Sequence, residues 1–207
     1  MKRDVTLIET KDITAVILCG GKGSRFGLVE KPLALFTRAG ITAAMVDHVL
    51  ASLPENLPRL ISANTYIEDY GTRGQVVGDA DLNNAEGPLL GVYSAMHLVT
   101  SPWVLVCPGD MPLLPTNWYA PLMEQATEAD RPWVLHDGSR LQPLLCLIPT
   151  GFAEDLYSYL EGGNRSVHQW HSRVRAKEVL VSAADTARAF TNINTQRELE
   201  RLSDLQP

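Results

Sequence analysis

The chain has 207 residues, of which 45% are apolar and 20% charged, proportions typical of a globular protein with room for one sizeable domain. Its formal net charge of -6, from 24 acidic and 18 basic residues, argues against a general nucleic-acid binder, because such binding requires a basic surface. No apolar stretch reaches the length that spans a membrane and the first ten residues lack an apolar signal core, so we expect a cytoplasmic protein.

Apolar runs alternate with helical patterns over the first half of the chain. We predict strands at residues 13–19, 58–63, 75–79 and 103–107. Helical spacing occurs at residues 41–53 and again at residues 88–99, where Gly87 and Pro88 open the pattern. Strands and helices in alternation indicate an α/β fold with a parallel sheet. Cys19, Cys107 and Cys146 lie far apart within apolar runs, and we expect them to be reduced core residues.

The pattern changes after about Pro112. Residues 133–149 read as two strands around a turn at Asp137 and Gly138, which predicts an antiparallel excursion of the mostly parallel sheet. We then predict helices at residues 152–163 and 166–174, a strand at residues 177–183, and a last helix opened by a capping box of Thr195 and Glu198.

The stretch LCGGKGSRFGLVEKPL, residues 18–33, follows the first predicted strand and contains four glycines. Glycine lets a chain turn tightly and lets backbone amides approach a ligand, and such amides suit a phosphate. Arg25 and Lys31 would add positive charge. The spacing does not match a Walker loop, because a proline follows Lys31. It does not match a dinucleotide fingerprint either, because that motif requires its third glycine one place earlier than Gly27. A plain surface loop is the alternative interpretation.

A second motif, WVLVCPGDMPLLP, ends a predicted buried strand with one carboxylate, Asp110. Ligands of open parallel sheets lie beyond the carboxyl ends of the strands, so we expect the glycine loop and Asp110 to face one cleft. An aspartate in this position can hold a magnesium ion that bridges phosphate oxygens. Alternatively, Asp110 only accepts hydrogen bonds from turn amides. Asp79 ends its strand in the same way, with less nearby to indicate chemistry.

Together with EGPLLGV, HDGSRLQPLLCLI, GGNRSV and FTNINTQREL, these motifs stand in the order and approximate spacing of the molybdenum cofactor guanylyltransferases, which the chain resembles from residue 13 to about residue 202. The resemblance implies a three-layer Rossmann-like nucleotidyltransferase fold in a single domain, residues 1–207. About residues 13–112 would form its nucleotide-binding half and about residues 113–207 its acceptor-binding half. It also implies that GMP passes from GTP to the phosphate of molybdopterin, with Mg²⁺ as cofactor and pyrophosphate as product.

The resemblance also implies roles for individual residues. The nucleotide would be bound by Leu18, Cys19, Gly20, Gly21, Lys31, Ser62, Asp79 and Asp110. Catalysis would fall to Lys31, Asp110 and Arg25, with Asp110 as the magnesium ligand. The acceptor would be bound by Arg165, Asn192 and Asn194. The expected partners are other cofactor-biosynthesis proteins and molybdoenzyme chaperones. We expect neither nucleic acid nor a membrane as a partner.

Several positions leave alternatives open. Ser62 stands where the family has an asparagine, although Asn64 lies on the same strand face two residues on. Gly109 stands where a cysteine is common, and we expect it to loosen the turn before Asp110. Asn192 and Asn194 point to one face of an extended segment, where they bind an acceptor or only tie a turn. His168 and His171 lack a third ligand nearby in the sequence, which favours a packing or solvent-facing role.

Two other functions remain possible from the sequence alone. One is a related transferase that uses CTP or a sugar-phosphate acceptor, although the paired Gly20 and Gly21 favour guanine by analogy with the family. The other is a nucleotide-binding adaptor without turnover, which the retained Lys31 and Asp110 argue against.

Overall fold

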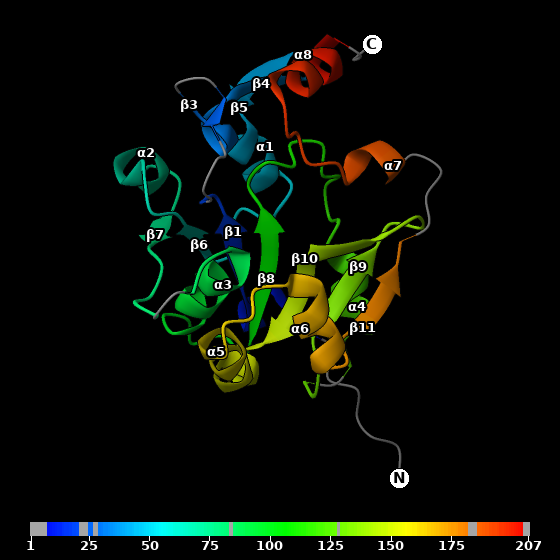
Figure 1. Cartoon of the computed structure of the whole chain (residues 1–207). Helices are drawn as coiled ribbons and strands as arrows, with labels where there is room; N and C mark the ends of the chain where they lie inside the picture. Colours follow the sequence, from blue (N-terminus) through cyan, green and yellow to red (C-terminus); the bar gives the residue numbers. More distant parts are fainter. Residues whose placement is uncertain are drawn as a thin grey trace.

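A computed structural model describes residues 8–20, 25–26, 29–82, 85–127, 129–181 and 186–204; at residues 25, 26, 29, 186, 187 and 204 it describes the backbone only. Its centre is a seven-stranded sheet in the order β11-β9-β10-β8-β1-β6-β7 (Figure 1). The strands are β1 (Ile13–Leu18), β6 (Arg59–Ser62), β7 (Gln75–Val77), β8 (Trp103–Pro108), β9 (Trp133–His136), β10 (Leu141–Pro149) and β11 (Lys177–Leu180). Only β10 runs antiparallel to its neighbours, β8 and β9, so the predicted parallel sheet with one antiparallel excursion is confirmed.

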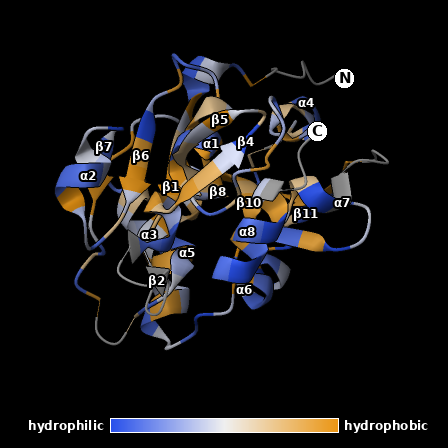
Figure 2. Cartoon of the chain, turned by 90° about the horizontal axis from the view of Figure 1, so that it is seen from above, coloured by the Kyte–Doolittle hydropathy of each residue, from blue (hydrophilic) through white to orange (hydrophobic). Residues whose placement is uncertain are grey.

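Helices cover both faces of the sheet. The α-helices of the described residues are α1 (Met45–Ala51), α2 (Ile67–Gly71), α3 (Pro88–Met96), α4 (Ala120–Gln125), α5 (Ala153–Glu161), α6 (Val167–Arg173), α7 (Thr186–Ala189) and α8 (Gln196–Asp204). Short 3₁₀ helices span Thr10–Asp12, Lys31–Leu33 and Thr150–Phe152. The view from above shows α1 and α4 on one side of the apolar strands and α3, α5 and α6 on the other (Figure 2). The expected three-layer α/β architecture is therefore confirmed.

Strand β1 shows why the sheet is central. All of its residues but the last are buried, and successive side chains enter different cores because they alternate between the two faces. Ile13, Ala15 and Ile17 pack in the core beneath α1 and α4, whereas Val16 packs in the core beneath α3, α5 and α6. The three cysteines are free and buried, as predicted.

Two hairpins lie beside the main sheet: β2 (Arg25–Phe26) with β3 (Val29–Glu30), and β4 (Leu35–Arg38) with β5 (Ile41–Ala44). The prediction of a helix from residue 41 is wrong for its first turn. Ala39 and Gly40 have φ angles of 49° and 78°, and two successive residues of positive φ form the tight turn that returns a strand. The chain therefore pairs back on itself before α1 begins at Met45.

The segment before α8, residues 190–195, crosses the carboxyl edge of the sheet and is called the crossing segment below. Ile193 is fully buried and packs with Phe36, Met45 and Leu199, and its backbone N–H donates to the carbonyl of Asp110 over 3.1 Å. The predicted capping box is present, since Thr195 and Glu198 each accept a hydrogen bond from the backbone N–H of the other. Along the described ranges, no helix combines the length and the apolar character that crossing a membrane requires.

Candidate functional site

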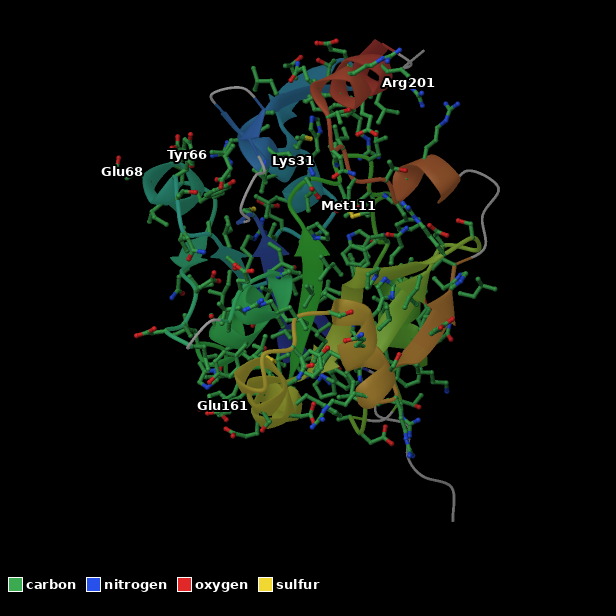
Figure 3. The ribbon with its side chains drawn as sticks, viewed as in Figure 1. Lys31, Tyr66, Glu68, Met111, Glu161 and Arg201 are labelled. Atoms are coloured by element: carbon green, nitrogen blue, oxygen red, sulfur yellow. The ribbon has the colours of Figure 1, made fainter. Side chains whose placement is uncertain are left out.

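Lys31 and Asp110 form the centre of the candidate site. Lys31 begins the short helix after β3 and Asp110 follows β8, so both stand at the carboxyl edge of the sheet. The ammonium nitrogen lies 2.5 Å from Oδ2 of the carboxylate, and the two side chains are only 10% and 17% exposed. Figure 3 labels Lys31 and Met111, the neighbour of Asp110, just above the end of β8. Lys31, near the end of the glycine-rich segment, and the carboxylate thus meet at one edge of the sheet.

The two asparagines of the crossing segment lie against this pair. The amide of Asn192 donates to Oδ1 of Asp110 over 2.7 Å, and Nζ of Lys31 donates to Oδ1 of Asn194 over 2.8 Å. Their side chains share one face because Ile193 between them points into the core. Both oxygens of Asp110 and two of the three donors of Lys31 are therefore engaged within the site.

The turn after β1 is fixed to the strands on both sides of it. The amides of Cys19 and Gly20 donate to the carbonyl of Ser62, over 2.9 Å and 3.1 Å, and the amide of Gly109 donates to the carbonyl of Leu18 over 2.8 Å. Gly20 is not among the glycines with positive φ, and a Cβ there would meet its nearest atom at 3.7 Å. Conformation thus does not require a glycine at position 20, which leaves the close approach of a ligand as its predicted reason.

Two predicted site residues of the glycine-rich segment are only partly placed. Gly21 lies outside the described residues. Arg25 is described by its backbone alone, which pairs with that of Glu30 in the β2–β3 hairpin. The roles of both residues remain predictions.

The ends of β6 and β7 present a polar pair in which Asn64, rather than Ser62, takes part. The amide of Asn64 donates to Oδ2 of Asp79 over 2.7 Å, and the backbone N–H of Asp79 donates to Oδ1 of Asn64 over 2.8 Å. The side chain of Ser62 is buried, and a Cβ added at Gly91 of α3 would overlap its hydroxyl oxygen. Ser62 therefore contributes its carbonyl to the loop, while Asn64 and Asp79 stand exposed at the edge.

Gly109 does not loosen the turn before Asp110, contrary to expectation. A Cβ at this position would lie 2.6 Å from Sγ of Cys19, 3.3 Å from Cβ of Pro32 and 3.4 Å from the carbonyl oxygen of Leu18. The thiol of Cys19 thus fills the space that a side chain at position 109 needs. Burial, with the nearby Cys107, Glu30 and Asp110, raises the pKa of the Cys19 thiol well above its usual value, so the sulfur serves as packing and not as a nucleophile.

A buried carboxylate precedes the lysine. Glu30 is 4% exposed and accepts a hydrogen bond of 2.9 Å from the hydroxyl of Thr65. Its other oxygen has no hydrogen-bond partner among the described residues. Burial first, and then the neighbouring Cys19 and Glu30, raise the pKa of the Tyr70 hydroxyl. Glu30 thereby ties the backbone that carries Lys31 to the segment after β6, a link that sequence reasoning did not identify.

Arg165, predicted to bind the acceptor, lies just before α6 and forms an ion pair of 3.6 Å with Glu86. Glu86 immediately precedes the turn that opens α3. The pair therefore connects the two helices α3 and α6 on one face of the sheet. The contacts described here do not join Arg165 to Asn192 or Asn194, and its role in acceptor binding remains a prediction.

Beside Lys31 and Asp110 lies a hollow of about 320 Å³, lined by Arg140, Leu141, Gln142, Pro143, His168 and Asn192. Of these residues, the sequence analysis proposed only Asn192 as a binding residue. The missing signal was the direction of β10: in an antiparallel strand the first residues lie at the carboxyl edge of the parallel neighbours, which brings Arg140 and Gln142 to the site.

His168 is exposed and His171 is buried, which fits the solvent-facing and packing roles expected of them.

The donor set fits magnesium bound mainly through a nucleotide. In the parts of the chain that the structure describes, no three His, Cys, Asp or Glu residues gather as a closed metal cage. Mg²⁺ typically takes one or two carboxylates, with phosphate oxygens and waters completing its shell. Asp110 supplies such a carboxylate, and each of its oxygens keeps a lone pair beyond the hydrogen bond it accepts.

Comparison with known proteins bears on the whole chain. The family described as "MobA-like NTP transferase domain" matches residues 15–176. A molybdenum cofactor guanylyltransferase of Ralstonia nicotianae is 36% identical over 210 residues, which cover 96% of this chain and 99% of that protein. A molybdenum cofactor guanylyltransferase of Cupriavidus necator is 37% identical over 201 residues, which cover 93% of this chain and 97% of that protein. The crystal structure of molybdopterin-guanine dinucleotide biosynthesis protein A from Archaeoglobus fulgidus superimposes with a TM-score of 0.71 at 19% identity, covering 93% of this chain and 97% of that one, which shows a shared fold.

Proposed function

Because the chain belongs to the MobA-like NTP transferase family, we propose that it is a molybdenum cofactor guanylyltransferase, which transfers GMP from GTP to the phosphate of molybdopterin. The single observation that supports this reaction best is the contact of Lys31 with Asp110, with an asparagine amide on each. It gathers a cation, a carboxylate and two amides where parallel strands end, the usual ligand position of such sheets.

The reaction needs positioning and charge stabilisation more than a protein nucleophile. An oxygen of the acceptor phosphate forms a bond to the α-phosphorus of GTP, and the bond from that phosphorus to the α,β-bridging oxygen breaks. Pyrophosphate leaves with the electron pair. A phosphate is already a nucleophile, so the protein's task is to align the reactants and to balance charge. The buried, neutral thiol of Cys19 agrees with this assignment.

Lys31 is the residue suited to hold the phosphates. Its ammonium has three donors, of which Asp110 and Asn194 take one each, so one donor remains for a phosphate oxygen. The low exposure of the side chain strengthens such a contact, because less water screens the charge. The carboxylate of Asp110 keeps the ammonium oriented until the nucleotide arrives.

We propose Mg²⁺ as the cofactor, held by Asp110. When bound, this ion would offset the negative charge of the phosphates. The side-chain amide of Asn192 holds the carboxylate of Asp110 in a fixed rotamer, and the backbone N–H of Ile193 donates to the backbone carbonyl of Asp110. Asp110 is thus positioned from the crossing segment before any ligand binds.

Asn64 and Asp79 are suited to read the base. The Watson–Crick edge of guanine presents two adjacent donors, its N1–H and its 2-amino group, and an ionised carboxylate only accepts. Asn64 takes only one lone pair of Oδ2 of Asp79, so both carboxylate oxygens can still accept from the two donors of the base. Cytosine presents a single amino donor beside acceptors, so the same carboxylate would hold it less well. This pair therefore favours GTP over CTP.

We also propose that the protein acts in the cytoplasm and exchanges molybdopterin and product with other cofactor-biosynthesis proteins and molybdoenzyme chaperones. Its three free cysteines fit a reducing compartment.

The test combines binding with turnover. GTP with magnesium should raise the melting temperature more than CTP or ATP, because a ligand of the native state stabilises that state. Labelled GTP and molybdopterin should then yield labelled dinucleotide and pyrophosphate. Equal shifts with all three nucleotides would remove the guanine assignment, transfer from CTP would favour the cytidylyl alternative, and binding without pyrophosphate would favour the adaptor.

A further inference from the structure

The hollow of about 320 Å³ lies beside Lys31 and Asp110. Asn192 belongs to both places, because it lines the hollow and donates a hydrogen bond to Asp110. Its volume is at the lower end for small-molecule pockets and suits one ring system better than a whole dinucleotide. The polar pair of Asn64 and Asp79 belongs to β6 and β7, which lie beyond β1 on the side of β8 opposite to β10. The hollow is therefore separate from the edge assigned to the base of GTP.

The β10 wall of this hollow is irregular and firmly held. Pairing between β10 and β9 shifts register between Gln142 and Cys146, and such bulges redirect side chains and often occur beside active sites. Pro143, within the irregular stretch, accepts a hydrogen bond of 2.8 Å from Nε2 of the buried His171. Helix α6 thus fixes the wall from the side on which His168 lines the hollow.

Asp137 fixes the turn that leads into β10. Its Oδ1 accepts from the backbone amides of Ser139 and Arg140, each over 2.8 Å, and its Oδ2 accepts from Nε2 of Gln142 over 2.7 Å. Burial by itself raises the pKa of Asp137, but the hydrogen bonds from Arg140, Gln142 and Ser139 outweigh burial and hold the pKa well below its usual range. The carboxylate is therefore ionised and acts only as an acceptor.

This arrangement dictates the orientation of the Gln142 amide. Because Asp137 can only accept, Gln142 must direct its NH₂ group toward the carboxylate and its Oε1 elsewhere. No described residue donates a hydrogen bond to that oxygen, although Gln142 is only 6% exposed and lines the hollow. The oxygen is not one of the fully buried side-chain atoms that lack a partner among the described residues, so it keeps some accessible surface, and an N–H donor of a ligand can match it.

Building on the proposed function, we propose that the hollow receives the pterin ring of the acceptor and that Gln142 accepts a hydrogen bond from a ring N–H. A pterin is a flat bicycle with an amide-like edge, and its N–H groups face outward along that edge. Leu141 and Pro143 give the ring an apolar wall, and Arg140 lies at the rim. Asp137 acts as a positioning residue, because it sets the orientation of Gln142. The acceptor phosphate then extends past Asn192 toward Lys31 and Asp110.

The variant Gln142→Met tests this proposal, since it keeps the side-chain length and removes the acceptor, together with the amide donor to Asp137. Its matched control is Gln169→Met, the same change at an exposed position of α6 that does not line the hollow. Two measurements are made: KM for molybdopterin and for GTP in GMP transfer, and a fluorescence titration with free pterin. We expect Gln142→Met to raise KM for molybdopterin about tenfold and to weaken pterin binding equally, with KM for GTP unchanged, as for one lost hydrogen bond. Gln169→Met should behave as the wild type.

A Gln142→Met protein with wild-type KM for molybdopterin and wild-type pterin titration would overturn the proposal. If that variant does not fold, Arg140→Ala decides in its place, because the Arg140 side chain is 62% exposed and its loss leaves the core intact. An unchanged acceptor KM for Arg140→Ala overturns the proposal and a raised one supports it. A wild-type chain that transfers no GMP would contradict the proposed function instead, and the titration with free pterin would still decide what the hollow binds.

Discussion

The side-chain amide of Asn192 donates a 2.7 Å hydrogen bond to Oδ1 of Asp110, while Lys31 contacts the other oxygen of the same carboxylate. The carboxylate is thus held between a segment that follows the first strand and a segment that precedes the last helix. The site is complete only when both ends of the chain have folded onto the edge of the sheet. Stability and activity should therefore depend together on the crossing segment.

Asp110→Asn should reduce pyrophosphate release by at least about a hundredfold, because an amide neither neutralises Lys31 nor binds a cation as a carboxylate does. The fold should survive, since the side chain is partly exposed and an amide retains its shape. Initial rates with GTP, magnesium and molybdopterin measure the loss, and circular dichroism checks the fold. Turnover at the wild-type rate would remove Asp110 from the mechanism.

Ile193→Ala should lower the free energy of unfolding by about 2–5 kcal/mol, the usual cost of emptying a buried isoleucine site. It should also lower activity, because Ile193 anchors the segment that places Asn192 and Asn194. The matched control is Ile41→Ala, which makes the same change at a side chain that is 64% exposed. Urea titrations of both variants provide the measurement. Equal stability of the two would show that the segment is not anchored by Ile193.

Gly109→Ala should destabilise the protein by about 1–3 kcal/mol, because its Cβ would lie 2.6 Å from Sγ of Cys19. Cys19→Ala removes that sulfur and should restore much of the loss when the two changes are combined. A double-mutant cycle of unfolding free energies measures this coupling. Strictly additive effects would mean that the two positions do not compete for the same space.

His171 should make stability depend on pH. The pKa of His171 is lowered from its ordinary value of 6.5 to about 4, mainly by burial; the hydrogen bond to Pro143 opposes this shift, and the nearby His168 adds a smaller lowering. Between about pH 6.5 and about pH 4 the unfolded chain binds a proton that the folded chain does not. Stability should therefore fall as the pH is lowered through this window, by at most about 3 kcal/mol from this group.

His171→Gln can still donate to Pro143 but does not titrate, so the wild type should lose more stability than this variant across the same window. His168→Gln, which changes an exposed histidine on the same helix, should follow the wild type closely, because His168 is the smallest cause of the shift. Urea midpoints measured over the window compare the three proteins. Parallel curves for the wild type and His171→Gln would contradict the pKa assignment.

Sequence patterns predicted the sheet because its strands are short apolar runs that end in turns. The same patterns failed at residues 41–44, where a spacing compatible with a helix belongs to a hairpin strand. The local turn decided this case, since Ala39 and Gly40 both adopt positive φ. A glycine after a small residue was the available signal, and helical spacing outweighed it.

The site was predictable only in part. The rule that parallel strands end at one edge correctly brings Lys31 to Asp110. The alternation of side chains correctly places Asn192 and Asn194 on one face, but it does not name their partners. Gln142 was missed because its significance depends on a bulge, on the buried Asp137 and on a helix from elsewhere in the chain. These are tertiary relations that a local pattern does not contain.

The reversed direction of β10 has a consequence for how this protein can diversify. The short connection between His136 and Leu141 enters the carboxyl edge of the parallel strands from the side opposite to β6 and β7. It can change sequence or length without moving the strands that carry the proposed nucleotide site. Grafting this hairpin from a homologue should therefore exchange acceptor preference alone, which makes it a natural module for engineering.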